Sequence, residues 1–158
     1  MNFEDIANSK MSEIEAPTVL PEGTYLAKVA KPYEESQRGE DDKFTVITFP
    51  CEILEAGDQI KDPEALEAYG DPAGKSFRIE FWFNTSENLS GEDRERNDTA
   101  RRKMAKWLED ALEIDAETLK DAMTEAMGHQ FYAVITHQKN DNDPEVPYLR
   151  CNKWAPVE

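Results

Sequence analysis

The amino-acid sequence predicts one domain of mixed α and β structure, in which five mostly antiparallel strands form a small barrel. Three observations lead to this prediction. Three segments typical of strands occupy most of the first half of the chain, two amphipathic helical segments follow them, and two further strand segments end the chain. This order, with the helical pair between the third and fourth strands, is the layout of an OB-fold barrel. A half-open β-roll or another α+β sheet with the same element order is the alternative.

The composition fits a single folded domain. The chain has 158 residues, of which 39% are hydrophobic and 33% are charged, so it is long enough to bury a core. No apolar run approaches the roughly 20 residues of a membrane helix, and the start MNFEDIANSK has acids where a signal peptide carries bases. We therefore expect a cytoplasmic protein without membrane contact. We expect Cys51 and Cys151 to be buried and reduced, with a disulfide or metal ligation as weaker alternatives.

The domain is expected to begin after an N-terminal arm. Residues 1–16 form this arm, as a short amphipathic helix or a mobile segment, and residues 17–158 form the domain. Residues 24–33 alternate with period two and predict the first strand. Residues 34–42 are polar and contain one glycine, which predicts a loop. Residues 43–54 are rich in β-branched and aromatic residues, which predicts the second strand.

A short helix is expected between the second and third strands. Residues 62–70 begin with Asp62 as a cap and Pro63 at the first helical position, and they end with Gly70. Residues 74–84 then predict the third strand.

The helical pair follows this third strand. Asn97 or Asp98 can cap the first helix, which extends to residue 114, and Asp115 can cap the second. Residues 129–138 and 148–154 predict the fourth and fifth strands.

The third predicted strand, FRIEFWF, separates its side chains onto two faces. Alternation places Phe77, Ile79, Phe81 and Phe83 in the core. Arg78 and Trp82 then lie on the outer surface. The same alternation leaves outward side chains on the second strand, at Phe44, and on the fifth strand, at Tyr148, Arg150 and Trp154.

Exposed aromatic side chains among basic ones are typical of a surface that binds single-stranded nucleic acid. Bases stack on the rings while Lys and Arg contact the phosphates. An OB-fold uses the face of strands two and three together with the adjoining loops. The predicted nucleic-acid-binding residues are Arg38, Lys43, Phe44, Arg78, Trp82, Tyr148, Arg150 and Trp154. The alternative is that these aromatics pack under the helices or the arm as a second small core.

The charge of the chain argues against indiscriminate binding to nucleic acid. The formal net charge is −16, and phosphate binding depends on Lys and Arg. The middle of the chain differs, because residues 71–108 hold 7 acids and 8 bases. Within it, residues 94–106 hold six bases, which either extend a phosphate track or form a solvated helix face. An anionic partner must therefore be met locally.

The sequence has no signature of an enzyme. The P-loop, GxGxxG, HExxH and GxSxG patterns are absent. His129 and His137 lie on one side of a predicted strand but about 26 Å apart, so they cannot share a metal ion. We expect no catalytic activity, no metal and no cofactor.

Several segments together resemble a phage protein family. They are LPEGTYLAKV, KFTVITFPCEI, GKSFRIEFWFN, RRKMAKWLEDALEI and the closing MGHQFYAVI and NKWAP. The family consists of small proteins of unassigned function encoded among replication and recombination genes, and the resemblance covers about residues 17–156. It implies an OB-fold protein that binds single-stranded DNA. It also implies phage or host replication and recombination proteins as partners, and it leaves self-association open.

The chain differs from the family in two features, and two other functions are alternatives to DNA binding. The chain ends at KWAPVE without the acidic tail of many phage single-stranded DNA-binding proteins, and the insert DPEALEAYGDPAG lengthens the connection between strands two and three. The acidity favours an alternative, an interaction protein that mimics DNA to inhibit a host enzyme or serves as a virion component. A small-ligand binder at the barrel mouth is the third possibility.

Overall fold

The computed structural model describes residues 2–157 and, except at residue 13, their side chains. Met1 and Glu158, the outer ends of the expected arm and domain, lie outside it. The described chain is an α+β protein with a six-stranded antiparallel sheet and four helices. The strands are β1 (Gly23–Val29), β2 (Glu34–Arg38), β3 (Phe44–Ile60), β4 (Ser76–Asn84), β5 (Gln130–Gln138) and β6 (Tyr148–Ala155). The helices are α1 (Phe3–Ala7), α2 (Pro63–Tyr69), α3 (Gly91–Lys106) and α4 (Leu119–Glu125).

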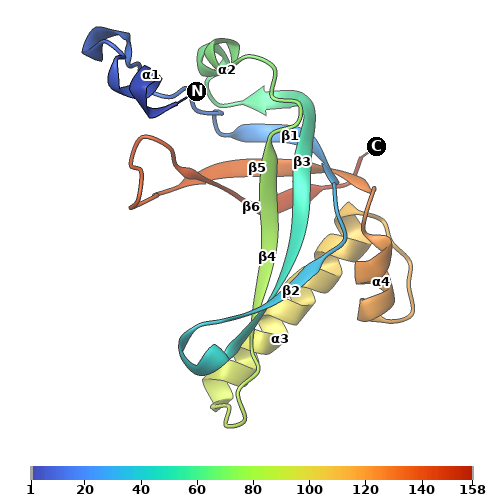
Figure 1. Cartoon of the computed structure of the whole chain (residues 1–158). Helices are drawn as coiled ribbons and strands as arrows, with labels where there is room; N and C mark the ends of the chain where they lie inside the picture. Colours follow the sequence, from blue (N-terminus) through green and yellow to red (C-terminus); the bar gives the residue numbers. More distant parts are fainter. Residues whose placement is uncertain (1, 158) are drawn as a thin grey trace.

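The long strand β3 organises the sheet. Its first half pairs with β2 on one side and β4 on the other, and its second half pairs with β1. β1 continues to β5, and β5 to β6. In Figure 1, β3 and β4 run together along the molecule, β5 and β6 cross them, and α3 lies beside their lower part.

The sheet does not close into a barrel, which corrects the closed arrangement expected from the sequence. β4 and β6 lie in contact, yet no ladder of hydrogen bonds joins them in residues 2–157. We call this line of contact the β4–β6 seam. Where β6 faces it, Asn152 is an extra residue in the pairing with β5, a β-bulge between Cys151 and Lys153. A bulge bends a strand and disrupts regular pairing.

A sixth strand lies where the sequence predicted a loop at residues 34–42. β2 pairs with the start of β3, from Glu34 opposite Thr48 to Arg38 opposite Phe44. Its side chains are mostly exposed, so it lacks the apolar alternation by which strands are recognised. The loop prediction holds only for the turn after β2, where Asp41 and Asp42 have φ values of 58° and 50°.

The helical pair exists, but its helices begin at other residues than predicted. Ser90 caps α3 through a capping box: its hydroxyl accepts from the Asp93 amide at 3.1 Å, and the Asp93 carboxylate accepts from the Ser90 amide at 3.3 Å. Asn97, predicted as a cap, lies inside α3. Thr118, not Asp115, caps α4. The predicted helix at residues 62–70 is confirmed as α2, with Asp62 as its cap.

The core gathers around Trp107, which is fully buried in the turn after α3. Its ring centroid lies 4.6 Å from that of Phe49 and 5.6 Å from that of Phe131. The predicted inward set of the third strand is confirmed: Phe77, Ile79 and Phe81 are buried, and Phe83 packs against the core. Cys51 and Cys151 are both buried and free, as predicted.

The N-terminal arm forms α1 and a short turn at Met11–Glu13. Asn2 caps α1, and the arm exposes large apolar side chains, among them Phe3 at 80% and Met11 at 86%. None of the helices described here is long and apolar enough to cross a membrane.

Candidate nucleic-acid interface

Two aromatic side chains lie together on the outer face of β3 and β4. The register places Val46 opposite Trp82, so Phe44 is the diagonal neighbour of Trp82 across the two strands. Their ring centroids are 5.6 Å apart in an edge-on arrangement. Trp82 is 44% exposed and Phe44 is half-buried. The outward direction predicted for both residues is confirmed.

A cation lies over each of these rings. The guanidinium carbon of Arg38, at the end of β2, is 5.7 Å from the centroid of Trp82. The Nζ atom of Lys43 is 5.2 Å from the centroid of Phe44. Such contacts stabilise by about 0.5–1 kcal/mol at exposed sites. A positively charged side chain therefore lies over each of the two neutral rings in the protein alone.

Glu80 lies between two arginines at the side of this aromatic pair. Its carboxylate is 3.7 Å from Nη1 of Arg38 and 3.8 Å from Nη1 of Arg150, and its side chain is only 12% exposed. These separations exceed the roughly 2.7–2.9 Å of a charge-assisted hydrogen bond. One oxygen of Glu80, Oε2, is buried without a hydrogen-bond partner among the described residues. Arg150 also donates from Nε to the side-chain oxygen of Gln138.

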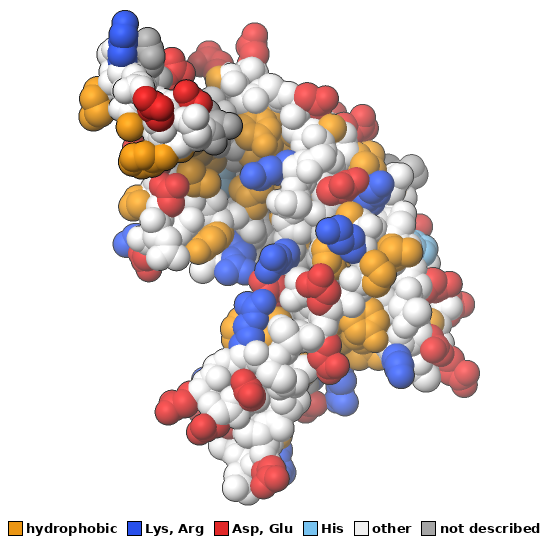
Figure 2. Space-filling model, in the orientation of Figure 1, with side chains coloured by type: hydrophobic (Ala, Val, Ile, Leu, Met, Phe, Trp, Pro, Cys, Tyr) orange, Lys and Arg blue, Asp and Glu red, His pale blue; other side chains and the backbone are white. Residues whose placement is uncertain are grey.

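Five of the eight predicted site residues form one connected group. Contacts link Lys43 to Phe44, Phe44 to Trp82, Trp82 to Arg38, and Arg38 through Glu80 to Arg150. Figure 2 shows a hollow in one side of the molecule, and several Lys and Arg side chains gather around it. We call Arg38, Lys43, Phe44, Trp82 and Arg150 the outer-face group.

The other three predicted residues lie apart from this group. Arg78 is exposed opposite Pro50, four residues from Trp82 along β4, or about 13 Å. Tyr148 is 45% exposed at the start of β6. Trp154 is half-buried, and its ring centroid lies 6.3 Å from that of the core residue Trp107. The predicted outward direction of Trp154 is wrong, because the bulge at Asn152 reverses the alternation after it.

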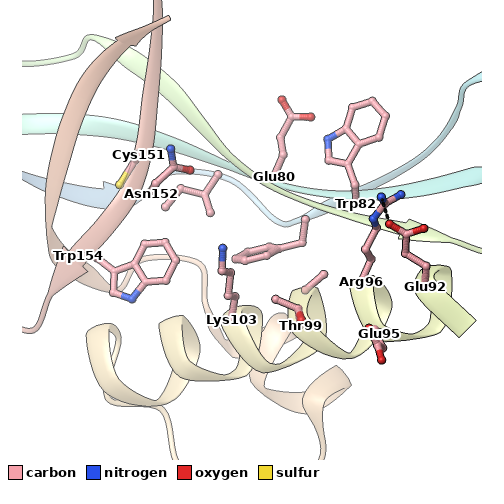
Figure 3. Close-up of a pocket in the computed structure, with 13 residues that line it drawn as sticks. Glu80, Trp82, Glu92, Glu95, Arg96, Thr99, Lys103, Cys151, Asn152 and Trp154 are labelled. Carbon is pink, nitrogen blue, oxygen red and sulfur yellow. Dashed lines mark hydrogen bonds and ion pairs between the residues drawn. The ribbon is translucent and has the colours of Figure 1, made fainter.

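A cleft that sequence reasoning missed borders this surface. It has a volume of about 570 Å³ and lies between β4, β6 and α3, with Trp82, Asn152, Trp154, Arg96 and Lys103 among its lining residues. In Figure 3, Lys103 and Trp154 lie on the side of β4 that faces α3, whereas the side chains of Glu80 and Trp82 point away from α3. The cleft joins segments far apart in the chain across the β4–β6 seam, so no local pattern indicates it.

The basic run on α3 is partly neutralised. Arg96 forms an ion pair with Glu92 at 2.8 Å, and Arg101 with Asp98 at 2.9 Å. These are helical pairs on a solvated face, the second of the two readings left open by the sequence. Lys103 lines the cleft, and it forms no ion pair within the described chain.

The described residues offer no group of three or more His, Cys, Asp or Glu side chains that could hold a metal ion. Burial raises the pKa of Cys151 to about 12, and burial also raises the pKa of the Cys51 thiol. Because the thiolate is the reactive form of cysteine, both side chains are protonated and inert at neutral pH. The side chains of the outer-face group are able to stack, to form ion pairs and to form hydrogen bonds.

Comparisons of the chain with known protein families, with curated proteins and with solved structures found no match. The resemblance to a phage family remains an expectation from the sequence. The interpretation of this surface therefore depends on its own geometry.

Proposed function

We propose that this protein binds single-stranded DNA, without catalysis, across the outer face of β3 and β4. The observation that carries the proposal is the pair of Phe44 and Trp82, with Arg38 and Lys43 over their rings. Every base has a flat π-face that can stack on an exposed ring, whereas its phosphates need cations. Both kinds of group lie within side-chain contact of each other here.

The strand order supports the proposal. β1, β3 and β4 follow one another as antiparallel neighbours, and the β5–β6 hairpin returns beside β1 so that β6 meets β4. With α3 between β4 and β5, we interpret this as an OB-like arrangement that stays open at the β4–β6 seam. In this interpretation β3 and β4 correspond to the second and third strands of an OB-fold. The outer-face group then lies on the side of these strands on which OB-folds bind oligonucleotides.

In this proposal, binding replaces the contacts of Arg38 and Lys43 with the two rings by contacts of the rings with bases and of the cations with phosphates. A base stacks on Trp82 and the next on Phe44, each contributing about 1–3 kcal/mol. Arg38 and Lys43 turn from the rings toward the phosphates. Duplex DNA is disfavoured because its bases are already stacked and the net charge of −16 repels its denser phosphates.

The biological setting of the proposal comes from the resemblance noted in the sequence. Phage replication and recombination expose single-stranded DNA that must be held without being cut. A coat protein needs no catalytic group, and phage or host replication proteins are its expected partners. In this setting the acidic remainder of the chain limits binding to single strands.

The direct test is fluorescence anisotropy with a labelled oligo(dT) at low salt. We expect Trp82→Ala to weaken binding at least about fivefold, since one stacked base contributes about 1–3 kcal/mol. Arg38→Glu should weaken it further. Phe3→Ala serves as the matched control, because Phe3 is an exposed aromatic residue on the arm. The proposal fails if the wild type does not bind, or if the Trp82 and Arg38 variants bind like the wild type.

The acidity supports a second candidate, an interaction protein that presents carboxylates to a basic host protein in place of DNA. The net charge of −16 is the observation in its favour. Such a protein binds no oligo(dT) at low salt, and it competes with DNA for its target. The anisotropy titration therefore separates the two candidates.

A further inference from the structure

A cleft at the β4–β6 seam lies beside the outer-face group. Its volume of about 570 Å³ lies within the roughly 300–1,000 Å³ of small-molecule sites. Trp82 lines it from β4, Asn152 and Trp154 from β6, and Lys103 from α3 (Figure 3). Trp82 belongs to both the cleft lining and the outer-face group, and its side chain points away from α3, so it lies at the border between the two surfaces.

The bulge on β6 determines how one polar and one aromatic side chain, Asn152 and Trp154, are placed at the cleft. As the extra residue in the ladder, Asn152 has no partner on β5, and its side chain is exposed. Bulges re-aim side chains in this way. Two residues later the Trp154 ring packs on Trp107 in the core. One side of this indole is thereby fixed, while the residue still lines the cleft.

Helix α3 forms one side of the cleft and contributes a positively charged side chain to it. Thr99, Ala100 and Lys103 share one face of the helix by their spacing, and all three line the cleft. The first two are small, which leaves room above them. Arg96 is held by Glu92 at 2.8 Å, whereas Lys103 has no ion-pair partner in the described part of the chain. Lys103 is therefore the cation best able to meet a ligand.

The edges of β4 and β6 that face each other at the seam are also able to form hydrogen bonds with a ligand. β4 pairs only with β3, and β6 only with β5, within residues 2–157. The backbone N–H and C=O groups along the seam consequently have no ladder partners. Backbone groups of this kind are strong donors and acceptors that are satisfied by water or by a ligand.

The acids around the cleft limit the charge of what it can hold. Glu80, Glu92 and Glu95 line it together with Arg96 and Lys103. A triphosphate brings several negative charges toward these carboxylates, which is unfavourable. A single phosphodiester brings one negative charge, which Lys103 can balance. An aromatic ligand with one negative charge fits the indoles, the Asn152 amide and Lys103 together.

We propose that the cleft binds one nucleotide unit of single-stranded DNA, an unstacked base with its phosphodiester, next to the strand on the outer face. The base lies against the Trp154 indole, the Asn152 amide both donates to and accepts from the base edge, and Lys103 contacts the phosphate. Trp82 lies where the strand passes from one surface to the other. This inference rests on the proposed function, and it adds a site that can distinguish one base from another.

The test uses the dinucleotide dTpT, whose two bases and single phosphate match this unit, and a longer oligo(dT). NMR follows the indole N–H signal of Trp154 while dTpT is titrated into the labelled full chain. We expect this signal to shift, and we expect Lys103→Ala and Asn152→Ala each to weaken dTpT binding at least threefold. Lys106→Ala is the matched control, since Lys106 is exposed on the same helix and does not line the cleft.

The outcomes separate this inference from the proposed function. If the wild type binds oligo(dT) through Trp82 but the Lys103 and Asn152 variants match Lys106→Ala, the cleft inference is overturned and the proposed function stands. If oligo(dT) binding is insensitive to Trp82 and Arg38, while dTpT still shifts the Trp154 signal and requires Lys103, the outer-face function falls and the cleft stands. An unmoved Trp154 signal at saturating dTpT also overturns the cleft inference.

Discussion

At the scale of single residues, Glu80 decides how strongly the outer face attracts an anion. Its carboxylate lies within 4 Å of the nearest nitrogen of both Arg38 and Arg150, although it hydrogen-bonds to neither. A phosphate that approaches either arginine meets this carboxylate as a competitor of the same sign. Glu80 thus forms ion pairs with two cations, from β2 and β6, and at the same time weakens their attraction for any other anion.

Replacing Glu80 with Gln is expected to strengthen oligo(dT) binding. The substitution removes one negative charge at nearly constant shape, and a neighbouring charge near a protein surface contributes on the order of 1 kcal/mol or more. We expect an increase in affinity of about fivefold at low salt. Anisotropy titrations of Glu80→Gln and of Glu64→Gln, on the exposed face of α2, provide the comparison. Weaker binding by Glu80→Gln would mean that Glu80 chiefly positions the arginines.

Glu22 is a second acid with a defined role, this time in stability. It accepts a hydrogen bond from the His137 amide at 2.8 Å and one from Lys61 at 3.1 Å. The His137 amide, and then Lys61, hold the pKa of Glu22 below its ordinary value of 4.5. A carboxyl group with a lowered pKa in the folded state stabilises the fold above its unfolded pKa, and the stabilisation is lost as the pH falls through the folded value.

We therefore expect Glu22→Gln to lower the free energy of unfolding at pH 7, with a smaller difference from the wild type below pH 4.5. Urea denaturation at pH 7 and at pH 3 measures the two differences. Glu55→Gln, an exposed acid on β3, is the control. A difference that does not change with pH would show that the charge of Glu22 is not what stabilises the fold.

At the scale of elements, α3 is attached to the sheet at a defined point. The Asn97 side chain accepts from the Asn84 amide at 2.8 Å and donates to the Asn84 carbonyl at 2.9 Å. This side chain takes the place of a neighbouring strand at the end of β4. It fixes α3 beside β4, and with it the position of Lys103 along the cleft.

Asn97→Ala should therefore destabilise the protein. It removes both hydrogen bonds to Asn84 and leaves two partly buried backbone groups unpaired, which costs about 1–3 kcal/mol. Chemical denaturation gives the change in the free energy of unfolding. Asn88→Ala, in the exposed loop before α3, should change it by less than about 0.5 kcal/mol. Equal stability of the two variants would contradict the role given to Asn97.

The elements also show which features of the fold are visible in the sequence. Regular alternation correctly placed Phe81 in the core and Trp82 outside, because each side chain on a regular strand follows its neighbour to the other face. Trp154 could not be placed in this way, since a single extra residue at Asn152 reverses the alternation. β2 was missed because pairing with β3, rather than burial of its own side chains, makes it a strand.

At the scale of the whole molecule, the net charge sets the conditions for the proposed binding of DNA. A chain with a net charge of −16 presents an unfavourable field to a polyanion, and only local cations oppose it. The cations placed to contact phosphates are Arg38, Lys43 and Arg150 of the outer-face group and Lys103 of the cleft. Their effect falls as salt rises, because bound counterions are no longer released with the same gain in free energy.

We expect the logarithm of the binding constant for oligo(dT) to fall linearly with the logarithm of the salt concentration. Four phosphate contacts at about 0.7 each for a single strand give a slope of about −3. Anisotropy titrations at four or more salt concentrations measure it, and Arg38→Gln should reduce its magnitude by about 0.7. Affinity that is unaffected by salt would exclude phosphate contacts as the source of binding.

The β4–β6 seam has a consequence for motion. Separating these two strands breaks side-chain packing but no ladder hydrogen bonds, so the sheet can part there while β1, β3 and β5 keep their pairing. Amide protons along the seam should exchange with solvent faster than those between β1 and β3, which exchange only when paired strands come apart. The width of the cleft is therefore set by side-chain packing between β4 and β6 rather than by strand pairing.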